Sequence, residues 1–153
     1  MIDCALFEPD IPQNAGTILR LGACLGAPVH IIHPSGFVLS ERNLRRAGMD
    51  YLDRADLREH DHWPAFQLWR RTAGRRLIAL STRGPVRLHD FTFHPEDVLL
   101  FGRESAGLPD PVLAEADSVL RIPIRPGNRS LNVAVAAAIA LAEALRQTDQ
   151  LPA

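Results

Sequence analysis

The sequence predicts an α/β fold in which a mainly parallel sheet carries helices on both faces. The predicted strands are short and apolar on both faces, and helical segments alternate with them along the chain. Strands of this kind are typical of parallel sheets, because crossover helices cover both faces of such a sheet. With 153 residues, of which 46% are hydrophobic and 23% charged, the chain is expected to form a single domain over residues 1–153.

The first quarter of the chain supplies a strand, a helix and a second strand. The apolar run at residues 2–7 predicts a strand, and residues 8–12, with two prolines and two acidic side chains, predict a turn. Residues 14–25 repeat apolar side chains at helical spacing and predict a helix, which Gly26 is expected to end. The short apolar segment at residues 29–32 predicts the second strand.

The middle of the chain continues the alternation. Ser40 is expected to cap a short helix that runs through residue 46 and ends at residues 47–48. Asp61 is expected to cap a helix that reaches about residue 71. The apolar runs at residues 76–81 and 98–101 predict two further strands.

The last third of the chain ends in a loop that enters a long helix. Residues 111–116 predict a short helix, residues 119–124 a strand, and residues 130–147 a helix that Ser130 is expected to cap. The connecting loop contains proline, glycine, asparagine and arginine, which favour a stiff backbone with exposed polar groups. Because a helix N-terminus presents unpaired N–H groups, this loop is expected to hold an anion or another ligand.

Composition excludes several classes of active site. All 17 basic residues are arginine, so neither a Schiff-base lysine nor the lysine of a phosphate-binding P-loop exists. The dinucleotide motif G-x-G-x-x-G and the hydrolase motif G-x-S-x-G are also absent. The six histidines do not pair with cysteine at ligand spacing, so no metal site is expected. A net charge of −1 permits local arginine patches but not a uniformly basic surface.

The two cysteines and the absence of a long apolar run indicate an intracellular chain. Cys4 and Cys24 lie in apolar segments and are expected to be buried free thiols rather than a disulfide. No apolar run approaches the roughly 20 residues needed to span a membrane. The N-terminus lacks the basic region of a signal peptide, so a cytoplasmic location is expected.

Three loops that follow predicted strands carry polar side chains that could form a site. Ligands in parallel α/β sheets gather at the carboxyl edge of the strands, where these loops meet. Each candidate also has a simpler interpretation: a solvated helix arginine for Arg20, an N-cap for Asn14, a partner of Arg103 for Glu104. Ser130 and Asn132 could equally be cap residues.

Taken together, the three loops resemble the motifs of one enzyme class. The segments PDIPQNAGTILRLGACLG (residues 9–26), LLFGRESAGLP (99–109) and RIPIRPGNRSLNVAVAAAIALAE (121–143) are similar to those of SPOUT-class RNA 2′-O-ribose methyltransferases. The segments at residues 29–34, 44–51 and 76–84 extend the resemblance to nearly the whole chain. The resemblance is closest to the small, single-domain group that methylates the ribose of the tRNA wobble nucleotide, position 34.

This resemblance implies a fold, a cofactor and a reaction. The fold would contain a deep C-terminal trefoil knot, and a homodimer would complete the site. The cofactor would be S-adenosyl-L-methionine, with S-adenosyl-L-homocysteine as product and no metal. The residues that match cofactor-contacting positions are Leu80, Gly102, Ile122, Ser130 and Leu131. Those that match catalytic positions are Arg20, Asn14, Glu104, Ser130 and Asn132. Arg20 is a poor base at its ordinary pKa, so we expect it to hold a phosphate and the developing alkoxide.

The implied substrate is the tRNA anticodon stem-loop, held through phosphate contacts. The arginines expected to bind RNA are Arg42, Arg45, Arg46, Arg125 and Arg129. Whether cytidine, a modified uridine or both are methylated stays open at this point. Two alternatives also stay open: a ribosomal-RNA 2′-O-methyltransferase of the same class, and a knotted cofactor- or RNA-binding module without catalysis.

Overall fold

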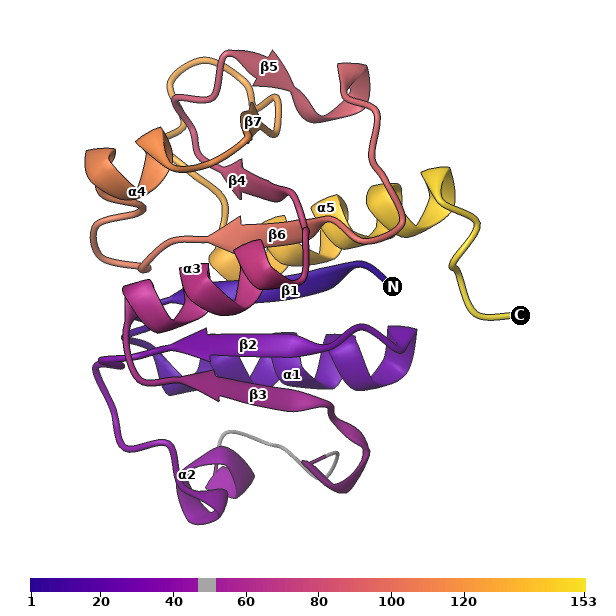
Figure 1. Ribbon diagram of the computed structural model, residues 1–153. Helices are drawn as coiled ribbons and strands as arrows, with labels where there is room; N and C mark the ends of the chain where they lie inside the picture. The colour runs from indigo at the N-terminus through magenta and orange to yellow at the C-terminus, as the bar shows by residue number, and fades with distance from the viewer. Residues whose placement is uncertain (47–51) are drawn as a thin grey trace.

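The computed structural model describes residues 1–46 and 52–153 and confirms the α/β prediction (Figure 1). In this part of the chain, seven strands form one sheet in the order β3-β2-β1-β6-β4-β7-β5, and all the pairings are parallel. The strands are β1 (Asp3–Phe7), β2 (Val29–Ile32), β3 (Leu57–His60), β4 (Leu77–Leu80), β5 (Val86–Arg87), β6 (Val98–Phe101) and β7 (Ser118–Arg121). The helices are α1 (Pro12–Leu25), α2 (Glu41–Arg46), α3 (Trp63–Thr72), α4 (Asp110–Ala114) and α5 (Val133–Gln147), with short 3-10 turns η1 (Leu52–Arg54) and η2 (Leu88–Asp90).

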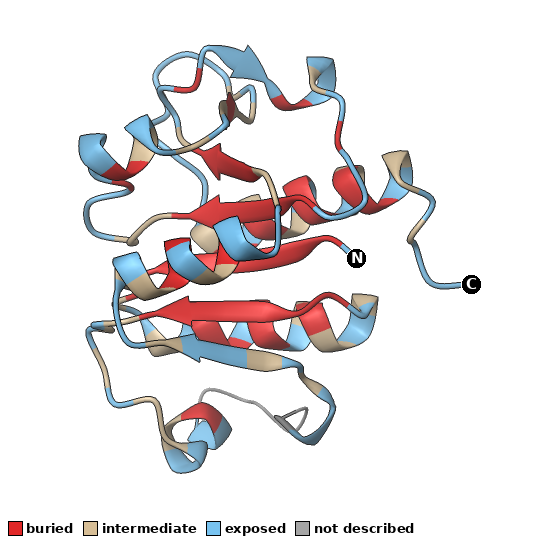
Figure 2. Ribbon diagram, in the orientation of Figure 1, coloured by how far each residue is buried: buried red, intermediate tan, exposed pale blue. Residues whose placement is uncertain are grey.

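Helices cover both faces of this sheet, as predicted. Alternate residues of β1 point to opposite faces: Cys4 and Leu6 join a core with α1 and α5, whereas Ala5 and Phe7 join a core on the side of α3 and α4. Figure 2 shows β1, β2, β4 and β6 fully buried between these two layers. A parallel arrangement places the carboxyl ends of all these strands at one edge, where the loops of the candidate site begin.

The two strands that the sequence did not predict lie at the edges of the sheet. β3 reads Leu-Arg-Glu-His and is largely exposed, and β5 consists of two exposed residues (Figure 2). An edge strand packs on fewer neighbours than an interior strand and can carry charged side chains. The apolar runs that identify interior strands are therefore missing from β3 and β5.

The starts of α1 and α3 differ from the prediction. α1 begins at Pro12, with Ile11 as its N-cap, so Asn14 lies inside the first turn and does not cap the helix. His62 rather than Asp61 caps α3, because its Nδ1 accepts a hydrogen bond from the Ala65 N–H at 3.1 Å. The predicted end of α1 is confirmed, since Gly26 adopts the left-handed conformation with φ of 74°.

The short helix after β2 starts as predicted. The Asn43 N–H donates to Ser40 Oγ at 3.1 Å, which is the expected cap of α2. The helix extends through Arg46, and its expected end at residues 47–48 lies outside the described residues.

The strand before the last helix and the start of that helix were both misplaced. β7 ends at Arg121 instead of residue 124, because Pro123 has no N–H to donate to a neighbouring strand. α5 begins at Val133 and is capped by Asn132, not by Ser130. α4 spans Asp110–Ala114 and lies within two residues of the predicted range.

The cysteine prediction is half right. Both thiols are free, but only Cys4 is buried and Cys24 is exposed. The buried residues of α1 are Ala15, Gly16, Ile18, Leu19 and Gly22. These positions are spaced three or four apart and so form one face of the helix, and Cys24 lies outside that face. In the described part of the chain, no helix is both long and apolar enough to cross a membrane.

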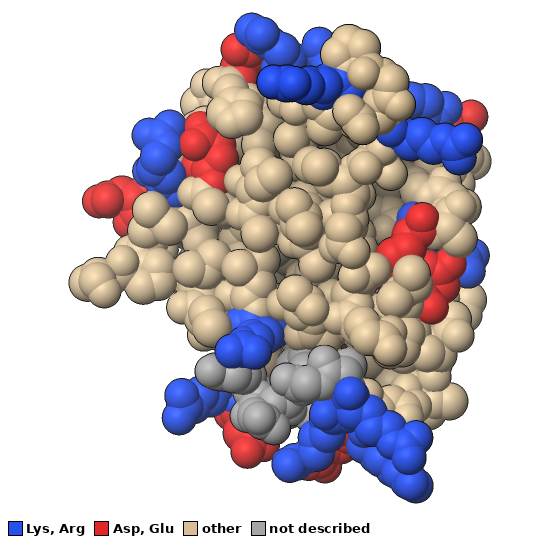
Figure 3. Space-filling model, turned by 180° about the vertical axis from the view of Figure 1, so that it is seen from behind, with Lys and Arg blue, Asp and Glu red and all other residues tan. Residues whose placement is uncertain are grey.

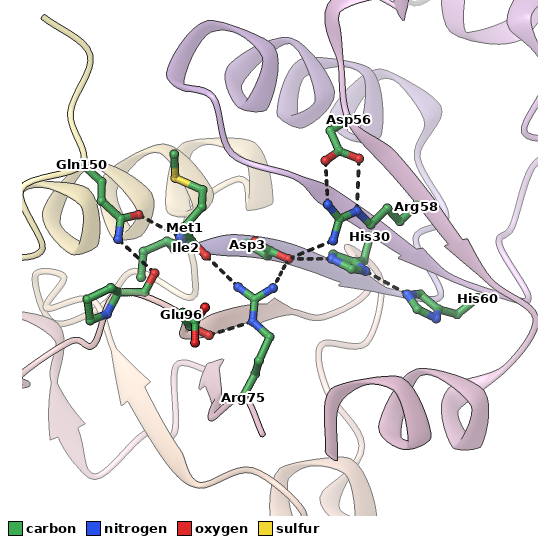
Figure 4. Close-up of polar contacts among 11 residues, drawn as sticks. Met1, Ile2, Asp3, His30, Asp56, Arg58, His60, Arg75, Glu96 and Gln150 are labelled. Atoms are coloured by element: carbon green, nitrogen blue, oxygen red, sulfur yellow. Dashed lines mark hydrogen bonds and ion pairs between the residues drawn. The ribbon is translucent and has the colours of Figure 1, made fainter. Parts of the chain in front are cut away.

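A polar cluster links the first three strands on the face of the sheet that α3 covers, and it extends from Asp3, the first residue of β1, to His60, the last residue of β3 (Figure 4). The Asp3 carboxylate accepts hydrogen bonds from His30 Nε2 at 2.9 Å and from Arg75 Nη1 at 2.6 Å. His30 Nδ1 in turn lies 2.8 Å from His60 Nε2. Burial alone would raise the pKa of Asp3, but the hydrogen bonds from His30 and Arg75 hold that pKa below its ordinary value.

This cluster predicts a pH dependence of stability. Burial, and then the nearby charges of His30 and Arg58, lower the pKa of His60 from 6.5 to about 4. The unfolded chain therefore binds a proton at His60 before the folded chain does as the pH falls. We expect the free energy of unfolding to decrease by about 2 kcal/mol between pH 6.5 and pH 4, measured by urea denaturation at several pH values.

The control for this prediction removes the titrating ring. His60→Gln should flatten the pH dependence in that window, whereas His94→Gln, at an exposed position, should leave it unchanged. An unaltered curve for His60→Gln would contradict the assignment.

Candidate active site

A cleft of about 590 Å³ opens at the carboxyl edge of β4, β6 and β7. Its walls come from residues 80–83, 101–108 and 129–133, together with Ile122 and Ile124. Ile11 and Asn14 at the start of α1, and Ala136 of α5, complete the lining. These are the loops that the sequence singled out and, in addition, the loop that follows β4. The volume lies in the range of small-molecule sites in proteins.

The five residues predicted to contact cofactor all line this cleft. Leu80 ends β4 and Gly102 directly follows β6. Ile122, Ser130 and Leu131 come from the loop between β7 and α5. The parallel register brings β4 against β7 and β6, which explains how segments far apart in sequence meet in one wall.

The loop after β6 folds back tightly on itself. Arg103 and Gly107 pair through two backbone hydrogen bonds, of 3.3 Å and 2.8 Å, and Gly107 has a φ of +67°. A methyl group at Gly102 would lie 2.4 Å from the carbonyl carbon of Gly107 and 2.5 Å from the nitrogen of Leu108. Glycine is therefore required at position 102 for the backbone to approach itself along the cleft wall.

Asn132 connects the first turns of α1 and α5. Its Oδ1 accepts hydrogen bonds from the N–H groups of Ala134 at 2.8 Å and Val135 at 3.3 Å, which is a cap of the helix. Its Nδ2 donates to Asn14 Oδ1 at 3.0 Å. One side chain thus caps α5 and also holds Asn14 at the cleft.

Glu104 faces Asn14 and the loop before α1. Its Oε2 accepts a hydrogen bond from the Asp10 N–H at 3.0 Å. Burial, and then the side chain of Asp10, raise the pKa of Glu104, while contact with Asn14 acts in the opposite direction. Hydrogen bonds with Glu104 and Ser105, and the charge of Arg103, lower the pKa of Asp10.

Arg103 does not pair with Glu104, as the simpler interpretation expected, but with Glu8 and Asp10. The Arg103 guanidinium lies 3.5 Å from Glu8 Oε2 and 3.8 Å from Asp10 Oδ2. Ser105 Oγ donates to Asp10 Oδ2. The sequence reasoning missed Asp10 and Ser105, although both belong to loops that it selected, because spacing along the chain does not reveal contacts between two loops.

The structure does not bring Arg20 to the cleft within one chain. Asn14 lines the cleft, but Arg20 lies almost two turns further along α1, is exposed, and is not among the residues of the cleft wall. Four of the five predicted catalytic residues therefore gather at one place, namely Asn14, Glu104, Ser130 and Asn132.

Comparison with known proteins places this geometry in a family. The family model described as "SpoU rRNA Methylase family" matches residues 1–142. The chain belongs to the SpoU rRNA methylase family. A protein of Beijerinckia indica subsp. indica named tRNA (cytidine(34)-2′-O)-methyltransferase is 58% identical to it, over 96% of this chain and 92% of that protein. A protein of the same name from Ancylobacter novellus is 56% identical, over 94% and 91% of the two chains.

Solved structures of other proteins share the same fold. One, described by the words "Structural insights into the 2-OH methylation of C/U34 on tRNA", superposes with a TM-score of 0.91 at 48% identity and covers 96% of this chain and 95% of its own. The SpoU methyltransferase AviRb from Streptomyces viridochromogenes, in complex with the cofactor AdoMet, gives a TM-score of 0.84 at 28% identity, over 96% and 57% of the two chains.

The arginines predicted to bind RNA lie in two groups on this SpoU family chain. Arg42, Arg45 and Arg46 belong to α2, where Arg45 pairs with Glu41 at 2.7 Å. Arg125 and Arg129 are exposed in the loop before α5, and Arg129 also lines the cleft. Figure 3 shows arginines at the lower and upper ends of the face that carries α1 and α5, with few charges between them. In the described residues, no cluster of three or more His, Cys, Asp or Glu side chains could hold a metal ion.

The two roles of Asn132 can be separated by substitution. Asn132→Ala removes the oxygen that caps α5 and should lower the free energy of unfolding by about 1 kcal/mol. Asn132→Asp keeps a capping oxygen, and its charge is favourable at a helix N-terminus, but it loses the Nδ2 donor to Asn14, so it should lose less stability than Asn132→Ala. Denaturation curves of both variants test this expectation, and equal losses in the two variants would refute the capping role.

Proposed function

We propose that this chain is an S-adenosyl-L-methionine-dependent tRNA 2′-O-methyltransferase that acts on the ribose at position 34. The observation that carries the proposal is the cleft in which Asn14, Glu104, Ser130 and Asn132 meet Leu80, Gly102, Ile122 and Leu131. Relatives up to 58% identical over nearly the whole chain carry the name tRNA (cytidine(34)-2′-O)-methyltransferase, which supports the substrate. Both cytidine and a modified uridine remain candidate nucleotides. We assign the reaction to the cytoplasm and keep the C-terminal trefoil knot as a prediction that family membership supports.

The cleft residues fit S-adenosyl-L-methionine. Leu80, Ile122 and Leu131 offer apolar contact for the adenine ring, and the close backbone at Gly102 offers N–H and C=O groups to its polar edge. Glu104 places negative charge near a positively charged ligand. When bound, this ligand supplies an electrophilic methyl group on a sulfonium sulfur.

The polar residues of the cleft suit the second substrate, a ribose hydroxyl. The 2′-hydroxyl is a poor nucleophile, so it must be oriented and must lose its proton as it attacks. The Asn14–Asn132 pair and Ser130 supply hydrogen-bonding groups that can orient the ribose. Arg20 would hold the neighbouring phosphate and stabilise the developing alkoxide, because a guanidinium offers several donors in a fixed plane.

A homodimer would complete the site by bringing Arg20 of a second copy to the cleft. α1 and α5 lie side by side, and this face carries few charges in Figure 3. Val135 and Ile139 on α5 are 48% and 36% exposed, and Ile11 before α1 is 41% exposed. A two-fold interface over these helices would bury apolar surface that one chain leaves in water.

The five arginines would hold the anticodon stem-loop through its phosphates. If each of them neutralises one phosphate, the slope of log K against log salt should be about −3.5, which is about −0.7 for each phosphate of a single strand. Filter binding of a tRNA anticodon stem-loop at several salt concentrations measures the slope, and substitution of Arg42 and Arg46 together by glutamine should make it shallower. A flat salt dependence would contradict this RNA surface.

The decisive experiment is incubation with labelled S-adenosyl-L-methionine and unmodified tRNA, followed by mapping of the labelled nucleotide. The proposal expects one methyl group on the ribose at position 34. If ribosomal RNA were labelled and tRNA were not, the substrate would be ribosomal RNA and the tRNA proposal would be wrong. Cofactor binding with no label on any RNA would instead indicate a module without catalysis.

A further inference from the structure

The proposed reaction needs a group that accepts the proton of the ribose hydroxyl. Within the described part of the chain, Glu104 is the only carboxylate, and the only side chain of ordinary basicity, among the residues that line the cleft. The other ionisable groups there are Arg83, Arg103 and Arg129, and a guanidinium does not give up its proton in proteins. Glu104 is therefore the candidate acceptor of the hydroxyl proton within the cleft.

Glu104 is held in one position by the loop before α1. The Asp10 N–H fixes Oε2 at 3.0 Å, and the side chain of Asn14 lies within hydrogen-bonding reach. Asn14 is itself fixed by Asn132 at 3.0 Å. The carboxylate thus belongs to the same rigid group as the side chains proposed to orient the ribose, which is the geometry that proton transfer requires.

Asp10 is arranged to receive a hydrogen bond that the other described residues do not supply. Its Oδ2 accepts from Ser105 and lies 3.8 Å from Arg103 Nε. Its Oδ1 is buried and has no donor among the described residues. The Asp10 N–H already holds the Glu104 carboxyl group beside the Asp10 side chain, so a proton on Glu104 would supply a donor to the Asp10 carboxylate.

We infer that Glu104 accepts the proton of the ribose 2′-hydroxyl and that Asp10 is the positioning residue that stabilises the protonated product. The inference rests on the proposed function. The hydroxyl oxygen forms a bond to the methyl carbon while the carbon–sulfur bond breaks, and that electron pair stays on sulfur as a neutral thioether. The O–H bond breaks, its electron pair stays on oxygen, and the proton passes to Glu104. Glu104 then donates to Asp10 until it releases the proton to water.

The surrounding charges agree with this division of roles. Arg103 and Ser105 stabilise the ionised form of Asp10 and so leave the proton to Glu104. Glu8, on the far side of Arg103, adds negative charge to the same cluster, and Arg129 faces the cleft from the loop before α5. The raised pKa of Glu104 brings the carboxylate closer to the working pH, where a general base is most effective.

The first test uses the protein without ligands. Carbon-13 NMR of carboxyl groups, with Glu104 assigned by its absence in Glu104→Gln, should show Glu104 titrating above the ordinary value of 4.5. Asp10→Asn removes the negative charge beside it, so the Glu104 titration should move to lower pH. Glu8→Gln is the matched control in the same loop and should shift this titration less than Asp10→Asn. A Glu104 titration at or below its ordinary value would overturn the inference.

The second test follows methyl transfer as a function of pH. Glu104→Gln should lower kcat about 10²- to 10⁴-fold, the range for loss of a general base. Asp10→Asn should lower kcat about 10-fold and move the acidic limb of the profile to lower pH, in parallel with the NMR titration. Unchanged kcat in Glu104→Gln would overturn the inference while leaving the proposed function intact. A native chain that methylates no RNA would overturn the proposed function and the acceptor role together.

Discussion

Arg20→Ala should abolish methyl transfer, by about 10³-fold or more, and leave the affinity for S-adenosyl-L-methionine nearly unchanged. The reason is that the residues expected to contact cofactor all line the cleft within one chain, whereas Arg20 does not, and in the proposed dimer Arg20 would face the ribose and its phosphate. Its guanidinium would act only where negative charge develops on the ribose oxygen. Single-turnover assays with labelled cofactor and calorimetric titration of the cofactor measure the two quantities. Arg71→Ala, which alters an exposed arginine on α3, should leave both unchanged.

Mixed dimers test whether Arg20 acts across the interface. If each site combines Glu104 of one copy with Arg20 of the other, a dimer of Arg20→Ala with Glu104→Gln retains one intact site. Random pairing of the two variants should then restore about a quarter of the native activity, although each variant alone is inactive. Both sites of the mixed dimer would be defective if Arg20 and Glu104 acted within one chain. An inactive mixture that contains verified mixed dimers would therefore rule out the shared site.

Gly102→Ala should destabilise the protein by about 3 kcal/mol and reduce cofactor affinity at least about 10-fold. The added methyl group meets backbone atoms of Gly107 and Leu108 at 2.4 Å and 2.5 Å, and backbone cannot rotate away as a side chain can. The loop after β6 must therefore shift, and that loop forms one wall of the cleft. Thermal denaturation with and without S-adenosyl-L-homocysteine measures both effects.

Gly74→Ala is the matched control for this variant. Gly74 follows α3 and has a φ of +67°, but a methyl group there would meet nothing within 4 Å. This variant should cost about 1 kcal/mol through backbone strain and keep full affinity for the cofactor. Equal losses of affinity in the two variants would show that general destabilisation, and not the wall of the cleft, explains the result.

The interior of the fold could be predicted from the sequence because burial imposes a pattern. β2 and β6 occupy the predicted residues, since a strand covered on both faces is mostly apolar; His30 in β2 is the exception, and it is paired with Asp3. β3 and β5 were missed because the edge of a sheet imposes no such pattern. Helix starts also went wrong where several cap residues compete, as Ser130 and Asn132 do within three positions.

The site was predicted by matching motifs, and its polar chemistry became visible only in three dimensions. Each residue expected to contact cofactor lines the cleft, because the motifs follow the strands whose ends converge there. The contacts of Asp10 with Glu104 and Ser105 join residues more than 90 positions apart, so no local pattern indicates them. The placement of Arg20 outside the cleft also depends on the direction of α1, which a motif does not specify.

Because Asn132 both caps α5 and contacts Asn14, the first amides of α5 should respond when a ligand binds in the cleft. The amides of Ala134 and Val135 are held by the same side chain that fixes Asn14 at the cleft. A molecule that immobilises Asn132 from the cleft side must also slow hydrogen–deuterium exchange at these two amides. Exchange at the start of α5 therefore measures occupancy of the cleft directly, without a label on any ligand and without turnover.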